Sequence, residues 1–166
     1  IPANSNAPLR ALTVENIEAR LRLLPGDQWR LDDLHARFAG ADILVSATIS
    51  NATAVRDWEF LKGRSATPDA RWPERLQRLA DTLESISFAA PPELRLVFEG
   101  DARNLQSFNA RFNLNAAQAD TPWGQAETIN FTSRLFAAAT NELSRVEITL
   151  NAASAQTRWA NTTNLN

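Results

Sequence analysis

Hydrophobic and polar residues alternate along most of the first fifty positions, the pattern of strands with one buried face. From Leu12 to Leu24 apolar residues recur at every second position, and a change of parity at Glu15-Asn16 predicts a β-bulge. Pro25-Gly26-Asp27 marks a turn. A second strand is expected from Trp29 to Phe38, with another parity shift at Asp32-Asp33, and a third strand follows it. The pattern predicts an antiparallel meander.

The middle of the chain changes to helical spacing. Thr53 is placed to cap a short helix over Ala54–Leu61, with Gly63 as its stop. A longer helix is expected from Pro73 to about Ser87. Its apolar stripe consists of Leu76, Leu79, Ala80, Leu83 and Ile86. Because its polar face carries both signs of charge, we expect this helix to lie on a sheet rather than on a membrane surface.

Period-two alternation returns after the helices and continues almost to the end of the chain. Its apolar positions fall into four groups: Leu94, Leu96 and Phe98; Phe108, Ala110, Phe112 and Leu114; Ile129, Phe131 and Leu135; and Val146, Ile148 and Leu150. Breaks are expected at Glu99-Gly100-Asp101, Thr121-Pro122 and Thr140-Asn141. The fold class is therefore α+β and mostly β. Residues 1–8 form a linker, and residues 9–166 form a single β-rich domain with a helical insertion at 53–90, its two helices at about 53–88.

The C-terminal part of the chain contains an internal repeat. Residues 111–130 align with residues 147–166 without insertion or deletion. The identical pairs include Asn115-Ala116-Ala117 with Asn151-Ala152-Ala153, Thr121 with Thr157, and Trp123 with Trp159. A fainter copy containing Trp29 opens the chain, so the unit is a long β-hairpin with a tryptophan just past its turn. The last copy stops at Asn166, about where its second strand is expected to begin, which predicts a fragment of a longer repeat protein.

The composition of the chain excludes several kinds of chemical site. The chain has no cysteine and one histidine, His35, which excludes disulfides, thiolate zinc sites and a two-histidine relay. Asp32-Asp33 and the pair Glu99 and Asp101 occupy bulge or turn positions, where acids serve backbone geometry. The net charge of −2 gives no attraction to nucleic acid. We therefore expect no enzyme, no cofactor and no metal ion, and no run of residues reaches the ~20 apolar positions of a transmembrane helix.

The phrase Ala-x-Ala-Asp-Thr-Pro-Trp-Gly, from Ala117 to Gly124, together with the alternating strands, resembles the AsmA-like family of large periplasmic proteins, which includes the translocation-and-assembly-module B type. The resemblance covers the two β-rich parts and does not extend to segment 53–90. It implies a taco-like, curled antiparallel sheet with an apolar inner groove. It also implies a periplasmic protein, anchored in the inner membrane, that carries phospholipid between the inner and outer membranes.

The apolar face is the candidate lining of such a groove, with a phospholipid or another acyl-chain ligand as its partner. The candidates are Ile17, Leu21, Leu23, Phe38, Val45, Phe98, Phe108, Phe112, Leu114, Phe131 and Ile148. The alternative is a closed core under the helices, which would make the chain a structural or protein-interaction module of the cell envelope without a ligand. Neighbouring repeats of the parent chain are expected partners in either case.

Three tryptophans, Trp29, Trp123 and Trp159, mark the repeats. We interpret them as structural pins at hairpin ends rather than as ligand platforms. A third hypothesis, a periplasmic hydrolase or glycan-binding protein, requires an acidic cleft lined by tryptophan.

Overall fold

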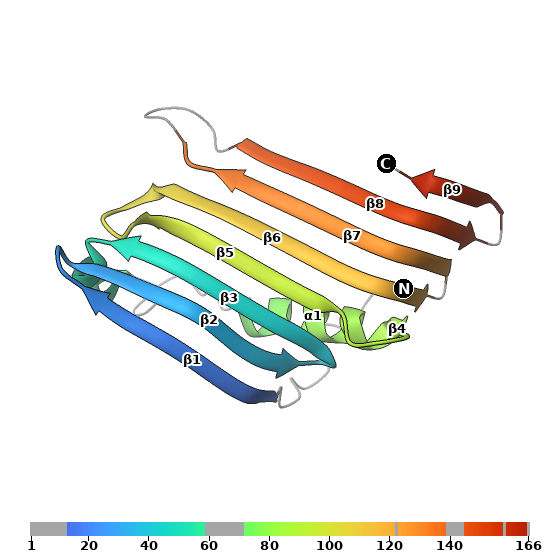
Figure 1. Ribbon diagram of the computed structural model, residues 1–166, viewed down its shortest axis with the longest axis horizontal. Helices are drawn as coiled ribbons and strands as arrows, with labels where there is room; N and C mark the ends of the chain where they lie inside the picture. The colour runs from blue at the N-terminus through green and yellow to red at the C-terminus, as the bar shows by residue number, and fades with distance from the viewer. Residues whose placement is uncertain (1–12, 59–71, 122, 139–144, 158, 166) are drawn as a thin grey trace.

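The computed structural model describes residues 13–58, 72–121, 123–138, 145–157 and 159–165 (Figure 1). These residues form a single curled, unclosed sheet with two short helices, which confirms the mostly β, α+β class. The strands are β1 (Val14–Leu24), β2 (Gln28–Phe38), β3 (Ala41–Ser50), β4 (Ser87–Phe88), β5 (Glu93–Asp101), β6 (Asn104–Thr121), β7 (Gly124–Phe136), β8 (Arg145–Thr157) and β9 (Asn161–Leu165). The helices are η1 (Ala52–Asp57), which is a 3₁₀ helix, and α1 (Trp72–Ser85).

The strands lie side by side in the order β1-β2-β3-β5-β6-β7-β8-β9, and β4 pairs with β6 outside this path. Every neighbouring pair is antiparallel except β3 and β5, which are parallel. Parallel neighbours need a long crossover to bring the chain back to the same end of the sheet. The helical insertion connects β3 to β5, and its helix α1 lies over one face of the sheet (Figure 1).

The opening meander of β1, β2 and β3 is confirmed, including both predicted bulges. Asn16 has φ 52° and Asp33 has φ 46°, and the strand register shifts at both places. Asparagine and aspartate tolerate this left-handed backbone better than most residues, because their short polar side chains bond locally. The parity changes seen in the sequence therefore mark real irregularities of the ladder.

Two details of the expected boundaries are wrong. Thr53 lies inside η1 rather than at its cap, because Asp27 takes both of its donors: the Thr53 N–H to Asp27 Oδ1 at 3.0 Å and the Thr53 hydroxyl to Oδ2 at 2.7 Å. The break expected at Glu99 to Asp101 comes slightly later, since Gly100 still pairs with Ile49 and β5 ends at Asp101, although the register with β6 already shifts between Glu99 and Asp101. The predicted helix end at Leu61 and Gly63, and the break at Thr140-Asn141, lie outside the described residues.

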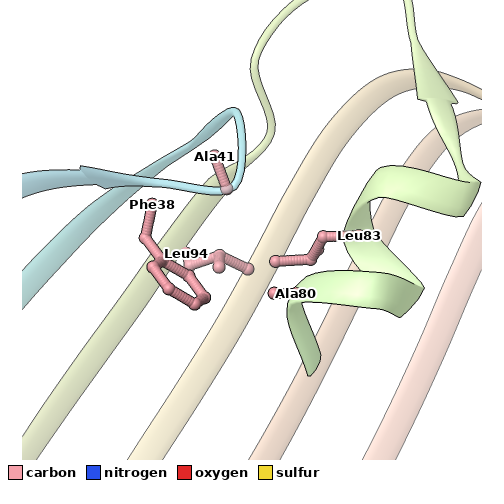
Figure 2. Packing of buried hydrophobic residues seen from close by; sticks show 5 residues of the cluster. All are labelled: Phe38, Ala41, Ala80, Leu83 and Leu94. Atoms are coloured by element: carbon pink, nitrogen blue, oxygen red, sulfur yellow. The ribbon is translucent and has the colours of Figure 1, made fainter. Parts of the chain in front are cut away.

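The longer helix lies on the sheet, as predicted, and its packing forms the buried core. Ala80 and Leu83 of α1 point toward Phe38, Ala41 and Leu94 from β2, β3 and β5 (Figure 2). All five side chains are less than a tenth exposed. This core is confined to the end of the sheet where β2 finishes and β5 begins.

The two hairpins of the 36-residue repeat have turns of the same construction. The Thr121 hydroxyl accepts the N–H groups of Trp123 and Gly124, both at 3.2 Å, and donates to the Gly124 carbonyl at 2.9 Å. Thirty-six positions later, the Thr157 hydroxyl accepts the N–H groups of Trp159 and Ala160 at 3.3 and 3.0 Å and donates to the Ala160 carbonyl at 3.1 Å. The second hairpin is more complete than expected, because β9 already begins at Asn161.

Candidate functional site: an open apolar face

Strand register places the apolar residues in rows that cross five strands, β3, β5, β6, β7 and β8. The first row is Ile43, Leu94, Leu114, Phe131 and Leu150; the second is Val45, Leu96, Phe112, Ser133 and Ile148; the third is Ala47, Phe98, Ala110, Leu135 and Val146. These positions share one face, because side chains on a strand alternate between faces. Ser133 is the one polar residue among the three rows.

The same face continues across the N-terminal strands. Leu31 of β2 pairs with Ala47 of β3 and with Leu21 of β1, and Trp29 pairs with Ile49 and with Leu23. The apolar surface therefore extends from the β1 edge of the sheet to β8.

The opposite face is polar. The rows between the apolar ones are Ser46, Val97, Arg111, Arg134 and Glu147, and Leu44, Arg95, Asn113, Thr132 and Thr149. Cross-strand hydrogen bonds join side chains of this face, as between Thr132 Oγ1 and Asn113 Oδ1 at 3.0 Å. A sheet with one charged and one apolar face leaves the apolar face to be covered by another apolar group.

Exposure of the apolar face varies across the sheet. Phe38 and Leu94 are 7% exposed beneath α1, and Val45, Phe98, Phe108, Phe112, Leu114 and Phe131 are half-buried in the middle. At both flanks the side chains are open. In β1, Ile17, Leu21 and Leu23 are 62%, 56% and 70% exposed; in β8, Val146, Ile148 and Leu150 are 55%, 65% and 56% exposed. Monomeric soluble proteins seldom expose so many large aliphatic side chains on one continuous face.

A hollow of about 400 Å³ lies on this face, toward the other end of β5 from the buried core. Its lining, which we call the bowl, is Trp58, Leu96, Phe98, Leu105, Phe108 and Ala110. The Trp58 and Phe108 rings meet edge to face at 5.9 Å between centroids, and the Phe98 and Phe108 centroids are 6.4 Å apart. The Trp58 indole N–H donates to the Ala102 carbonyl at 2.8 Å, which holds the ring in place.

Acidic residues have structural roles on the polar face and in turns. Asp32 forms ion pairs with Arg22 and, at 3.0 Å, with Arg30. The hydrogen bond from Arg22 holds the pKa of the Asp32 carboxyl below its ordinary value. Asp101 accepts the Asn51 amide at 2.7 Å and the Arg103 N–H at 2.8 Å, and so orders the turn between β5 and β6.

The residues that the structure describes hold no candidate metal site. They include no group of three or more histidine, aspartate or glutamate side chains arranged to hold a metal ion. His35 lies opposite Glu18 and Leu44 in the ladder and is exposed. The bowl holds a tryptophan but no acidic residue, so it lacks the acidic lining that the glycan-binding or hydrolase hypothesis requires.

The marker tryptophans occupy two different environments. Trp29 is half-buried in β2, between Leu23 and Ile49. Trp123 and Trp159 lie in the two equivalent turns and are 67% and 83% exposed.

Sequence reasoning placed eleven residues on the groove face and missed others. Ile43, Leu96 and Leu150 belong to the same alternation but are not among the predicted lining residues. Trp58 lies at helical spacing from Val55, but that spacing does not show that its ring reaches the sheet, and Leu105 comes from the start of β6 after its turn. Tertiary structure alone brings them together.

Comparisons with known proteins give no functional assignment, so a function has to be inferred from the geometry. The chain matches no protein-family model, no curated protein and no solved structure. In the described part of the chain, neither helix combines the length and the apolarity needed to cross a membrane.

Proposed function

We propose that this chain is a non-enzymatic segment of a bacterial envelope protein, and that its apolar face binds the acyl chains of phospholipid. In this proposal the parent protein is periplasmic, is anchored in the inner membrane, and transfers phospholipid between the inner and outer membranes. The observation that carries the proposal is the pair of open flanks, Ile17 to Leu23 in β1 and Val146 to Leu150 in β8, on a face whose apolar rows extend from β1 to β8.

The energetic case follows from those exposures. Full burial of a leucine or isoleucine side chain contributes about 1.5–3 kcal/mol. Each flank side chain is more than half exposed, so an acyl chain that covers it contributes about 1 kcal/mol. The six flank residues together therefore favour an apolar ligand by several kcal/mol.

The geometry suits a hydrocarbon chain better than a compact polar ligand. Neighbouring strands lie about 4.8 Å apart, so each apolar row extends about 19 Å from β3 to β8. That is enough for an acyl chain, which extends about 15 Å in one leaflet of a bilayer. Across the three rows the face offers a single hydroxyl, that of Ser133, and otherwise presents aliphatic and aromatic side chains.

Native mass spectrometry of the gently purified chain, expressed in a Gram-negative host, tests the proposal. We expect part of the population to carry a mass increment that fragments to a phospholipid. A spectrum of folded protein with no lipid adduct, repeated after incubation with phospholipid vesicles, contradicts the proposal.

A second candidate is a structural or protein-interaction module of the cell envelope. The outer edge of β1 favours it: within the described part of the chain this eleven-residue strand pairs with β2 alone. An unpaired edge offers a row of backbone donors and acceptors to another strand. This candidate predicts no ligand, and partner binding that is insensitive to a charge on the apolar face, as in Ile148→Glu.

A further inference from the structure

The bowl is an open hollow of the apolar face, lined by residues of two neighbouring strands and of the crossover. Trp58 comes from the crossover, Leu96 and Phe98 from β5, and Leu105, Phe108 and Ala110 from β6. We propose that the bowl is the subsite for the methyl end of an acyl chain. This inference rests on the proposed function and adds an orientation to it.

The chemistry of the lining excludes a lipid head group. Its one polar hydrogen, on the Trp58 indole nitrogen, is already donated to the Ala102 carbonyl at 2.8 Å. A phosphate or a carboxylate placed there would lose its water without gaining a donor from the lining, which is strongly unfavourable. Covering an apolar lining with hydrocarbon in place of water is favourable. The lining therefore favours a hydrocarbon chain over a lipid head group.

The space in the bowl depends on two small residues. At Gly100 an added Cβ would lie 2.5 Å from the Phe108 Cγ, so the absence of a side chain lets the Phe108 ring lie low against the sheet. Ala110, two residues further along β6, leaves room beside that ring. The hollow of about 400 Å³ falls within the usual range of small-ligand sites.

The surroundings of the bowl determine how a bound chain continues. Leu96 lies in the second apolar row, and Phe98 and Ala110 lie in the third, so the bowl opens directly onto both rows. At the other end of β5, Leu94 is covered by Leu83 of α1. A chain whose methyl end occupies the bowl therefore runs outward along the rows toward Leu135 and Val146, and its head group stays outside the hollow.

Quenching of Trp58 fluorescence by brominated phosphatidylcholine tests this orientation. The Trp58 signal is the part of the emission of the full chain that is lost in Trp58→Phe. We expect bromine near the methyl end of the acyl chain to quench this signal at least twice as strongly as bromine near the carbonyl end. Equal quenching, or stronger quenching from the carbonyl end, overturns the inference.

A matched pair of variants separates filling of the bowl from a general effect on lipid binding. Ala110→Leu fills the hollow, whereas Ala153→Leu makes the same change at an exposed alanine of β8 outside it. We expect Ala110→Leu to reduce the methyl-end quenching by more than half and Ala153→Leu to leave it unchanged, with circular dichroism confirming that both variants fold.

The outcomes distinguish the inference from the proposed function. If lipid binds, as judged by native mass spectrometry, but neither bromine position quenches Trp58, the face binds lipid and the bowl does not, which overturns the inference alone. If no lipid binds at all, both fail.

Discussion

The ring of Phe108 lies where a β-carbon of residue 100 would be. A Cβ built on Gly100 would approach Cγ of Phe108 to 2.5 Å and both Cδ atoms to 2.6–2.7 Å. Residue 100 is paired with Ile49 of β3, and the register with β6 shifts between Glu99 and Asp101, so the glycine lets the Phe108 ring lie against an irregular part of the strand. The bowl therefore depends on a contact between a strand backbone and an aromatic face.

Gly100→Ala is expected to destabilise the fold by about 1–3 kcal/mol, the range for overpacking at a tight contact. The added methyl must displace Phe108 and with it the edge-to-face contact with Trp58. Urea denaturation followed by fluorescence measures the change. Because a smaller side chain at residue 108 relieves the clash, Gly100→Ala with Phe108→Leu should cost less than the two single changes added together. Strict additivity would show that the two residues do not interact.

The structure explains one of the differences between the two copies of the repeat. Gly124 in the first turn corresponds to Ala160 in the second. A Cβ on Gly124 would meet the backbone oxygen of Gln156 in β8 at 2.1 Å. Ala160 precedes β9, which has only β8 beside it among the described strands. Alanine is therefore tolerated there.

Gly124→Ala should lower stability by about 3 kcal/mol, because the clash is with backbone and cannot be relieved by a rotamer change. The equivalent change in reverse, Ala160→Gly, should cost less than about 1 kcal/mol. Thermal unfolding of the two variants measures both. Similar losses at the two positions would contradict the account of the repeat.

The Asp32 ion pairs make a pH-dependent contribution to stability. Arg22 and Arg30 favour the charged carboxylate, and the pKa of Asp32 is held below its ordinary value of 3.8. A lowered carboxyl pKa stabilises the folded state above the unfolded pKa, and this stabilisation is lost as the pH falls through the folded pKa. Asp32→Asn should therefore reduce the urea midpoint at neutral pH by a small amount, and this difference from the wild type should disappear once the pH has fallen below the lowered folded-state pKa of Asp32.

Asp33→Asn is the matched control for that measurement. Asparagine tolerates the left-handed backbone at this bulge, where φ is 46°. No ion pair to Asp33 is found among the described residues. A loss at neutral pH as large in Asp33→Asn as in Asp32→Asn would assign the effect to the bulge instead of the ion pairs.

Local sequence patterns predicted the elements whose cause is local. The meander follows from alternation, and its bulges follow from parity changes at Asn16 and Asp33, residues that accept the backbone they need. The helix α1 follows from its stripe and from Pro73 at its first turn. Thr53 shows the limit of this reasoning, because Asp27, far away in sequence, satisfies both of its donors.

The features that depend on distant parts of the chain could not be predicted. The parallel pairing of β3 and β5 requires the crossover to return to the same end of the sheet, and no local signal states that. The bowl requires Trp58 to meet Phe108 across fifty positions. Ile148 and Phe112 lie in the same row and follow the same alternation in the sequence, yet Phe112 is half-buried and Ile148 is exposed. The alternation predicts the face on which a side chain lies but not how much of it is covered.

The central claim, that the open apolar face binds lipid, is tested most directly by native mass spectrometry of two variants of one strand. Ile148 and Thr149 are neighbours in β8, both exposed, and they lie on opposite faces of the sheet. Ile148→Glu places a charge on the apolar face, and Thr149→Glu places the same charge on the polar face. We predict that the wild-type chain and Thr149→Glu carry phospholipid and that Ile148→Glu loses at least nine-tenths of it. Equal lipid occupancy in the two variants, or no lipid on the folded wild-type chain, would contradict the account.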